Sequence, residues 1–569
     1  MDHDLVVRNG TVVDGRGGPS FRGDVAMSGG QITAVGPVGS VEGNGREELD
    51  ADGLVVAPGF VDGHTHRDAQ LVWDDLGTSS GWHGVTTAVM GNCGFTLAPA
   101  SAEQSALVVR NLERAEDISG AAMAAGITWT WSTFREYLDA VDARPKGLNY
   151  AAPIGHSALR TWAMGERAFT EAATEEDLAV MERELGDALA AGAVGFTTSR
   201  SDQHETSDDR PVASRLATWD EVQRLVAQVG RESEGIFQMT SEKASFDPDP
   251  AVRAEYYARL RDLAVTTGVP IAFGLFALAN GANTLALMEE TAALGGQMYG
   301  LTHCRGVATV LSFRTRLPFD NLPEWRSVRE QPLDAQRAAL LDPDVRARLV
   351  QEAHHGDYGR AIGAEARKPD FDVMTVMRST YLPNPTVAQV AAERGQDPVQ
   401  CIIDLALESD FEQFFVQTLT PQPEEQLLEL LRSPHSAMTF SDAGAHVSQI
   451  LDCSIQTHLL AYFVRERGLL SIEEAIPMIT RQPAAMWRLH DRGVLAEGYA
   501  ADVTIIDLDR VAPDMPDVVT DLPGGARRLV QTAQGYAATI VNGEVLTRDG
   551  KATEARPGRL LRGRGRPSR

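Results

Sequence analysis

The sequence predicts an α/β protein, a (β/α)₈ TIM-like barrel joined to a small composite β-sandwich domain that both termini form. Three observations lead to this prediction. The chain has 569 residues, more than one ordinary core holds, so a large domain and a smaller one are expected. Short apolar runs alternate with helix-like stretches through its middle, which is typical of parallel strands with crossover helices. Both ends instead carry β-branched runs broken by Gly and Asp, which is typical of hairpins.

The two β-rich ends are expected to form one domain from residues 1–57 and 490–557. The first end contains the runs LVVRNGTVVDG, DVAMSGGQITAVG and GLVVAP. The second contains ADVTIIDLD and AATIVNGEVLTRDG, in which Asn542 and Gly543 form the pair most typical of a tight hairpin turn. Residues 558–569, GRLLRGRGRPSR, have little to bury and are expected to be a disordered basic tail.

Residues 58–489 are expected to form the barrel. A helix is predicted over 174–192, opened by Thr174 and an acidic first turn and ended by Gly192. The interval of about 315–435 holds helical patterns beyond what one crossover needs, so it is expected to be a helical insertion that folds over the barrel mouth as a lid. The eight strand candidates are APGFVDGHTH, TTAVMGNCGF, NYAAPIGH, AVGFTTSR, GIFQMTSE, VPIAFGLF, GQMYGLTHCR and SAMTFSDAGAH.

Charge and cysteine content limit the possible partners. The chain has 52 Lys and Arg against 79 Asp and Glu, a net charge of −27 that repels phosphate backbones and anionic membranes. Neither nucleic acid nor a membrane is therefore expected as a partner, whereas a homo-oligomer stays open. The four cysteines are scattered, and the start MDHDLVVRNG lacks the basic and apolar regions of a signal peptide. These features predict a cytoplasmic protein without structural disulfides.

The strongest local signal is GFVDGHTH, which places His64 and His66 two residues apart. On a strand such residues project from the same face, so both imidazoles can converge on one metal ion at the strand end. The pattern alone is equally compatible with two surface histidines.

Several motifs together resemble the amidohydrolase superfamily, and within it the N-acyl-D-amino-acid deacylases. These motifs are the PGFVDGHTH run after a β-rich start, HGVTTAVMGNCGFTLAP, GHSALR, SDAGAH and the closing GYAADVTIIDLD. The resemblance implies that His64 and His66 are metal ligands, that Cys93 supplies a thiolate ligand, and that Asp442 is both ligand and proton shuttle. Thiolate and imidazole suit zinc, and a carboxylate beside a zinc-held water suits amide hydrolysis. Taken alone, a cysteine such as Cys93 is more often a small core residue than a ligand. Asp442 alone is equally typical of a turn, so its assignment depends on the resemblance.

The sequence also departs from this family. Where these deacylases show THxR and SHxK runs, the chain has FQMTSE (237–242) and IAFGLFA (271–277), so the usual histidines for a second metal are missing. No lysine lies in AVGFTTSR, which argues against a carbamylated lysine bridge. The expected cofactor is therefore Zn²⁺, one per chain. His303 in LTHCRG is the nearest substitute ligand, and it is equally interpretable as a residue beside the ligands or at the surface. His204 in SRSDQHE is an alternative, for which the position beside the ligands or at the surface is favoured over ligation.

The resemblance implies that the lysine of the SHxK run binds the substrate carboxylate in those relatives. This chain lacks that lysine. Arg305 and Arg200 follow strand candidates and are proposed as replacements at the barrel mouth, with His156 beside them. His446 is expected either to orient Asp442 or to cap the following turn.

The function predicted from these residues is metal-dependent hydrolysis of a carbon–nitrogen amide bond in a small molecule, with an N-acyl-D-amino acid as the favoured substrate. Hydrolysis of a cyclic amide or a lactone on the same metal site is an alternative. A catalytically inactive barrel acting as a binding module is an alternative of another class, suggested by the missing histidines.

Overall fold

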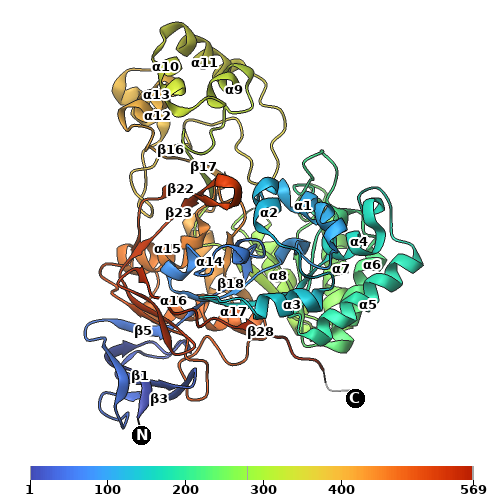
Figure 1. Cartoon of the computed structure of the whole chain (residues 1–569), viewed down its shortest axis with the longest axis vertical. Helices are drawn as coiled ribbons and strands as arrows, with labels where there is room; N and C mark the ends of the chain where they lie inside the picture. Colours follow the sequence, from blue (N-terminus) through green and yellow to red (C-terminus); the bar gives the residue numbers. More distant parts are fainter. Residues whose placement is uncertain (1, 279, 567–569) are drawn as a thin grey trace.

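The computed structural model describes residues 2–278 and 280–566, and its two ends share one sheet (Figure 1). Strand β5 (Val55–Pro58) pairs antiparallel with β20 (Val503–Ile506), which joins the N-terminal strands to the C-terminal ones. Asn542 and Gly543 both have positive φ, 47° and 82°, in the predicted tight turn. The other strands are β1 (His3–Val12), β2 (Phe21–Ser28), β3 (Gln31–Pro37), β4 (Gly45–Asp50), β25 (Tyr536–Val541), β26 (Glu544–Arg548) and β27 (Lys551–Ala552).

One hairpin from the C-terminal half leaves this sheet. It consists of β22 (Asp517–Leu522) and β23 (Ala526–Val530), which pair antiparallel. The Leu529 N–H donates to the Val447 carbonyl at 2.7 Å, so the hairpin contacts the chain that follows the last barrel strand.

The middle of the chain forms the closed barrel, and every predicted run contains one of its strand segments. Each segment pairs in parallel with the next in chain order, and β19 returns to β7 through Phe440 and His64. The segments are β6 with β7 (Phe60–Asp62, His64–Thr65), β8 (Val85–Val89), β9 with β10 (Asn149–Ala151, Ile154–Gly155), β11 (Gly195–Ser199), β12 (Ile236–Thr240), β13 (Ile271–Gly274), β14 (Met298–Thr302), and β18 with β19 (Ser436–Met438, Phe440–Ala443).

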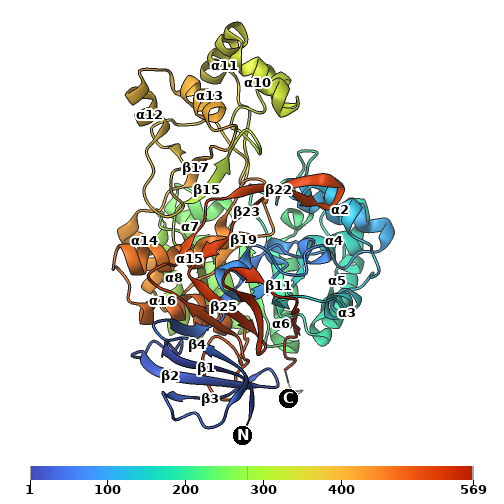
Figure 2. The same cartoon turned by 60° about the vertical axis from the view of Figure 1, so that its left-hand side comes forward.

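Helices between these strands lie outside the barrel (Figure 2). The predicted helix over 174–192 is confirmed as α5 (Glu175–Ala191), where the Thr174 side chain accepts from the Asp177 N–H and Gly192 ends the helix with φ of 106°. The neighbouring helices are α4 (His156–Met164), α6 (Trp219–Glu232), α7 (Pro250–Thr267) and α8 (Gly281–Ala293).

The insertion forms a lobe with a hydrophobic core of its own around Trp325. Its helices stand away from the barrel in both views, so they do not cover the mouth as a lid (Figures 1 and 2). The base of the lobe reaches the mouth, where Arg316 pairs with Asp117 at 2.9 Å, Glu365 pairs with Arg114 at 2.7 Å, and the Val310 N–H donates to the Gln449 carbonyl at 2.6 Å. The elements of the lobe are β15 (Val307–Leu311), α9 (Pro323–Arg329), α10 (Leu333–Leu341), α11 (Pro343–His355), β16 (Thr375–Val376), α12 (Val387–Arg394), α13 (Pro398–Glu408) and β17 (Phe415–Thr420).

The prediction of a disordered basic tail is wrong for residues 558–566. Strand β28 (Leu560–Leu561) pairs in parallel with β9 and fills a gap between the third and fourth barrel strands. The Gly563 N–H donates to the Gly192 carbonyl at 2.8 Å, and the Arg566 N–H donates to the Glu232 carbonyl at 3.1 Å. Composition did not reveal this docking because backbone hydrogen bonds, which any residue type can make, hold the segment. The rest of the predicted tail, 567–569, lies outside the described residues.

Two sequence expectations concern the chain as a whole. All four cysteines are free thiols, Cys93, Cys304 and Cys401 being buried. Within residues 2–278 and 280–566, no helix combines the length and the apolar character needed to cross a bilayer.

Candidate metal centre

His64, His66 and Asp442 come together because the first and last barrel strands are neighbours. His64 lies in β7 and Asp442 lies in β19, the strand that pairs with β7. The His66 N–H donates to the Ala443 carbonyl at 2.9 Å, which continues this pairing beyond the strand end. The three side chains therefore lie at the carboxyl ends of the strands, where barrel active sites form.

Cys93 joins this group from the turn after β8. It has a φ of 56°, a left-handed conformation that a cysteine rarely adopts, and Asp442 has the same value. The Cys93 N–H donates to Gln238 Oε1 on β12 at 2.8 Å, which holds the turn. Strained backbone of this kind costs about 1–3 kcal/mol per residue and concentrates at functional sites.

The donor atoms have the spacing of a metal coordination sphere. Cys93 Sγ lies 3.4 Å from His64 Nε2, and Asp442 Oδ1 lies 3.5 Å from His64 Nε2 and 3.1 Å from His66 Nε2. Ligands about 2.0–2.3 Å from one tetrahedral ion would lie about 3.3–3.7 Å from each other. Neither ring nitrogen of His66, which is fully buried, has a hydrogen-bond partner among the described residues. The residues present therefore fit a bound metal ion.

The pKa values describe a site that a cation would stabilise. Burial raises the pKa of the Cys93 thiol to about 11, although His66 opposes this. Burial likewise lowers the pKa of His64 to about 3, against the effect of Asp442. For Asp442, burial acts to raise the pKa, but the imidazole of His66, 3.1 Å away, outweighs it and holds the pKa low. A metal ion favours the thiolate and the neutral imidazole, the forms that act as ligands.

Glu116 is a member of the cluster that sequence reasoning missed. Its side chain is 2% exposed, and its Oε2 lies 3.4 Å from His66 Nε2 and 3.7 Å from His446 Nε2. Burial raises its pKa to about 8, with His66 opposing the shift and Asp442 adding to it. Glu116 follows helix α1 (Ser105–Glu113) in a segment without any motif, so no signal in the sequence pointed to it.

His446 and His204 lie at the edge of the cluster. His446 Nε2 is 3.8 Å from Asp442 Oδ2, and the His446 N–H donates to the Glu116 carbonyl at 2.6 Å. His204 is half-buried, its Nδ1 lies 2.7 Å from Ser199 Oγ, and its ring packs 5.3 Å from that of Phe95. His446 thus fixes the segment that carries Glu116, while His204 is oriented by Ser199 beside the donors.

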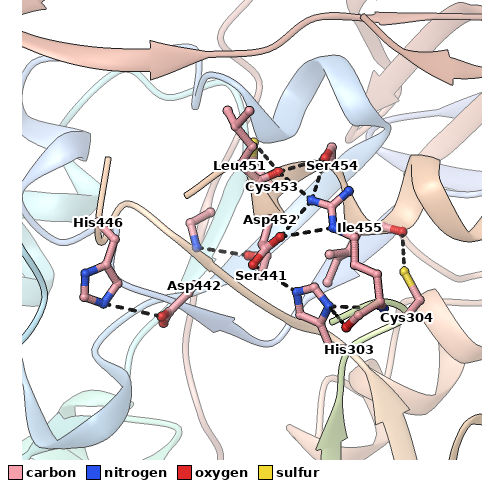
Figure 3. Close-up of polar contacts among 12 residues, drawn as sticks. His303, Cys304, Ser441, Asp442, His446, Leu451, Asp452, Cys453, Ser454 and Ile455 are labelled. Carbon is pink, nitrogen blue, oxygen red and sulfur yellow. Dashed lines mark hydrogen bonds and ion pairs between the residues drawn. The ribbon is translucent and has the colours of Figure 1, made fainter. Parts of the chain in front are cut away.

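The structure does not place His303 in either group of donors among the described residues. Its Nε2 lies 3.1 Å from Asp452 Oδ2, and its Nδ1 lies 2.9 Å from the Arg305 carbonyl. Figure 3 shows His303 beside Asp452, apart from Asp442 and His446. Arg305 is also occupied, because its Nη2 donates to Asp452 Oδ1 at 2.7 Å. The partner of both residues, Asp452, comes from the segment after the last strand, and no spacing in the sequence relates it to them.

The side chains of Arg200 and His156, which were expected to contact substrate, bind other residues of the protein instead. The Arg200 Nε donates to Glu242 Oε1 at 2.7 Å, so its charge is compensated. His156 is fully buried, with Nε2 2.8 Å from Glu221 Oε1 and Nδ1 2.9 Å from Thr198 Oγ1. Since both ring nitrogens of His156 are used inside the fold, this histidine holds α4 and α6 together instead of facing a ligand.

A cavity of about 280 Å³ lies beside the cluster, between the barrel mouth and the base of the lobe. Its lining includes His446, Gln449, Asp117, Arg316 and Asn321. The Arg316 Nη2 donates to Asp117 Oδ1 at 2.9 Å, whereas its Nη1 makes no hydrogen bond within the described part of the chain. The cavity therefore offers a small molecule a partly free cation, Arg316, in a lining that also includes His446.

A closed (β/α)₈ barrel with imidazoles, a thiol and carboxylates gathered at its strand ends defines a metal-dependent hydrolase. The chain belongs to the amidohydrolase family, whose model matches residues 47–547, and it is an enzyme that hydrolyses carbon–nitrogen bonds. Two curated relatives come from Alcaligenes xylosoxydans xylosoxydans. The N-acyl-D-aspartate deacylase is 29% identical over 571 residues, covering 98% of this chain and 95% of the relative. The N-acyl-D-glutamate deacylase is 29% identical over 567 residues, covering 98% and 96%.

A solved structure shows the same fold. It is the N-acyl-D-glutamate deacylase from Bordetella bronchiseptica, complexed with zinc and a phosphonate inhibitor that mimics the tetrahedral intermediate. The two chains are 23% identical with a TM-score of 0.62, over 99% of this chain and all of that one.

Proposed function

We propose that this enzyme removes the acyl group from an N-acyl-D-amino acid in the cytoplasm, using one zinc ion held by His64, His66, Cys93 and Asp442. The observation that carries the proposal is the convergence of these four side chains at the ends of the first, second and last strands. The names of the curated relatives support the substrate class, and the free cysteines support a reducing compartment.

The chain's own residues divide the chemistry among them. When bound, zinc supplies Lewis acidity and lowers the pKa of water to about 7. Asp442 accepts a proton from the attacking water and returns it to the leaving amine, since its carboxylate faces the same space as the donor nitrogens. The side chain of Asp442 is 18% exposed, so it remains open to substrate.

Arg316 is the residue that we propose for the substrate carboxylate, in place of Arg305 and Arg200. A carboxylate approaching a protein with a net charge of −27 needs a local cation. All three arginines have a carboxylate partner, but Arg316 lines the cavity beside His446 and is 54% exposed, whereas Arg305 and Arg200 are 22% and 16% exposed.

The test compares N-acyl-D-amino acids, their L enantiomers and neutral cyclic amides on the zinc-loaded enzyme. Arg316→Ala should raise KM for an N-acyl-D-amino acid about tenfold and leave an uncharged ester analogue nearly unchanged, because only the charged substrate loses a charge-assisted hydrogen bond.

Arg348→Ala is the matched control, since Arg348 lies on α11 of the lobe and is 53% exposed. It should leave KM unchanged for all substrates. Preference for neutral cyclic amides, with no response to Arg316→Ala, would refute the deacylase proposal and favour cyclic-amide hydrolysis on the same site.

A further inference from the structure

Two contacts fix Glu116 at the edge of the barrel mouth. Its N–H donates to the Leu112 carbonyl at 3.0 Å, which continues the last turn of α1, and its carbonyl accepts the His446 N–H. The next residue, Asp117, accepts from Ser448 Oγ at 2.7 Å and from Gln449 Nε2 at 2.9 Å. The segment is therefore held between α1 and the loop after β19, and it cannot turn Glu116 outward without breaking these bonds.

The carboxylate of Glu116 lacks an ordinary compensating charge. Its ion-pair contacts in the described residues are with the imidazoles of His66 and His446, and neither Arg nor Lys is among them. Its second oxygen, Oε1, is buried and has no hydrogen-bond partner there. Leaving a carboxylate buried in this way is costly unless a cation or several donors neutralise it.

Glu116 also lies within the coordination distance of the other donors. Oxygens of Glu116 and Asp442 and a nitrogen of His66 all lie within 4.8 Å of one another, and His64, His66 and Cys93 form a second such group. His66 belongs to both groups, and Asp442 Oδ1 lies 3.5 Å from His64 Nε2, so the two groups adjoin each other.

The barrel strands that lack histidine ligands leave room for such a donor. On β12 the inward Gln238 is occupied by the Cys93 N–H, and β13 contributes the segment IAFG, which contains no ligand side chain. In the described part of the chain, neither β12 nor β13 therefore supplies a metal donor.

We propose that Glu116 is a metal ligand, a carboxylate donor from outside the barrel strands that binds the same ion as His64, His66, Cys93 and Asp442. The assignment rests on the metal centre of the proposed function. It adds one donor, from the segment after α1, to the donors of the first, second and last strands. Sequence motifs of the strands alone cannot identify this ligand.

Cobalt(II) binding to the full-length apoprotein tests the assignment without any measurement of hydrolysis. The wild type should bind about one equivalent, with a thiolate-to-cobalt absorption band from Cys93. Glu116→Gln should keep that band, change the d–d absorption that reports the coordination sphere, and bind cobalt about 10–100-fold more weakly. Glu116→Asp, which retains a carboxylate, should recover part of the lost affinity.

The matched control is Glu113→Gln, which removes the same charge from the end of α1 and should leave both spectrum and affinity unchanged. Melting curves of the metal-free variants check that each is folded; if Glu116→Gln does not fold, the d–d spectrum of Glu116→Asp decides the question by the same criterion. Wild-type affinity and an unchanged d–d spectrum in the variant that folds would overturn the assignment. A wild type that binds cobalt as described but does not cleave N-acyl-D-amino acids would contradict the proposed function and leave the ligand assignment standing.

Discussion

Asp442 illustrates how a single residue is prepared for function by its backbone. Its left-handed conformation, φ of 56°, turns the carboxylate toward His64 and His66, and His446 four residues later is left-handed as well. Such conformations persist only where the surroundings determine them. Here the pairing of β19 with β7 and the hydrogen bond from the His66 N–H to Ala443 supply that constraint.

Asp442→Asn should retain the fold and lose about two to four orders of magnitude in kcat, because asparagine has the same size but cannot carry a proton. Cys93→Ser should differ from it, losing zinc during dialysis before the rate of the loaded enzyme falls. Steady-state kinetics and zinc content of the purified variants measure both effects. A correctly folded Asp442→Asn enzyme with a near-normal kcat would remove Asp442 from the proton transfer.

At this scale the sequence predicts only residues that belong to a motif. His64, His66, Cys93 and Asp442 were identified from short runs at strand ends, and the structure brings them together. Glu116 and Asp452 were not identified, because each becomes important through contacts between distant segments. The same limit applies to His303, whose partner Asp452 is 149 positions further along the chain.

At the scale of elements, apolar runs and turn residues were sufficient to predict the barrel strands and helix α5. The helical patterns within 315–435 also predicted helices correctly, but not where they lie. Whether a helical segment covers a barrel mouth depends on which apolar side chains it buries. In this chain the insertion buries Trp325, Phe319 and Leu349 in its own core and so stands apart.

This separate core predicts that the lobe can open by itself. Trp325 is fully buried, its Nε1 donates to the Leu349 carbonyl at 2.9 Å, and its ring lies 4.4 Å from that of Phe319. Trp325→Ala should destabilise the lobe by about 3–5 kcal/mol, so that limited proteolysis cuts within residues 315–415 while the barrel stays intact.

The control for this variant is Leu341→Ala, which changes an exposed residue of the same lobe. This variant should resist proteolysis as well as the wild type does. Cleavage that begins in the barrel of Trp325→Ala would show instead that the lobe and the barrel unfold together.

For the whole molecule, the two ends of the chain complete the structure in different ways. The β-branched runs at both ends were enough to predict that the ends share a sheet, because these runs and the Asn542–Gly543 turn are local sequence signals. The last residues carry no such signal. They bind at the starts of the third, fourth and fifth strands, where Tyr150 and Glu234 donate their N–H groups to Arg559 and Arg564 carbonyls at 2.9 and 3.0 Å.

Removing this segment should weaken the barrel without touching its chemistry. The test compares the melting temperature of a chain that ends at Pro557 with that of a chain that ends at Arg566. The shorter chain leaves backbone groups of Tyr150, Gly192 and Glu234 without partners, each lost hydrogen bond costing about 0.5–1.5 kcal/mol. Its melting temperature should therefore be several degrees lower.

KM and zinc content of the shorter chain should stay unchanged, because the segment binds at the amino ends of the strands and the metal centre lies at their carboxyl ends. Arg562→Ala within the longer chain is the control, since it removes the partly exposed ion pairs with Asp139 and Asp142 and should cost less than about 1 kcal/mol. Equal melting temperatures for the two chain lengths would show that the barrel does not depend on β28. A change in KM or zinc content at an unchanged melting temperature would show instead that the segment acts on the site and not on the fold.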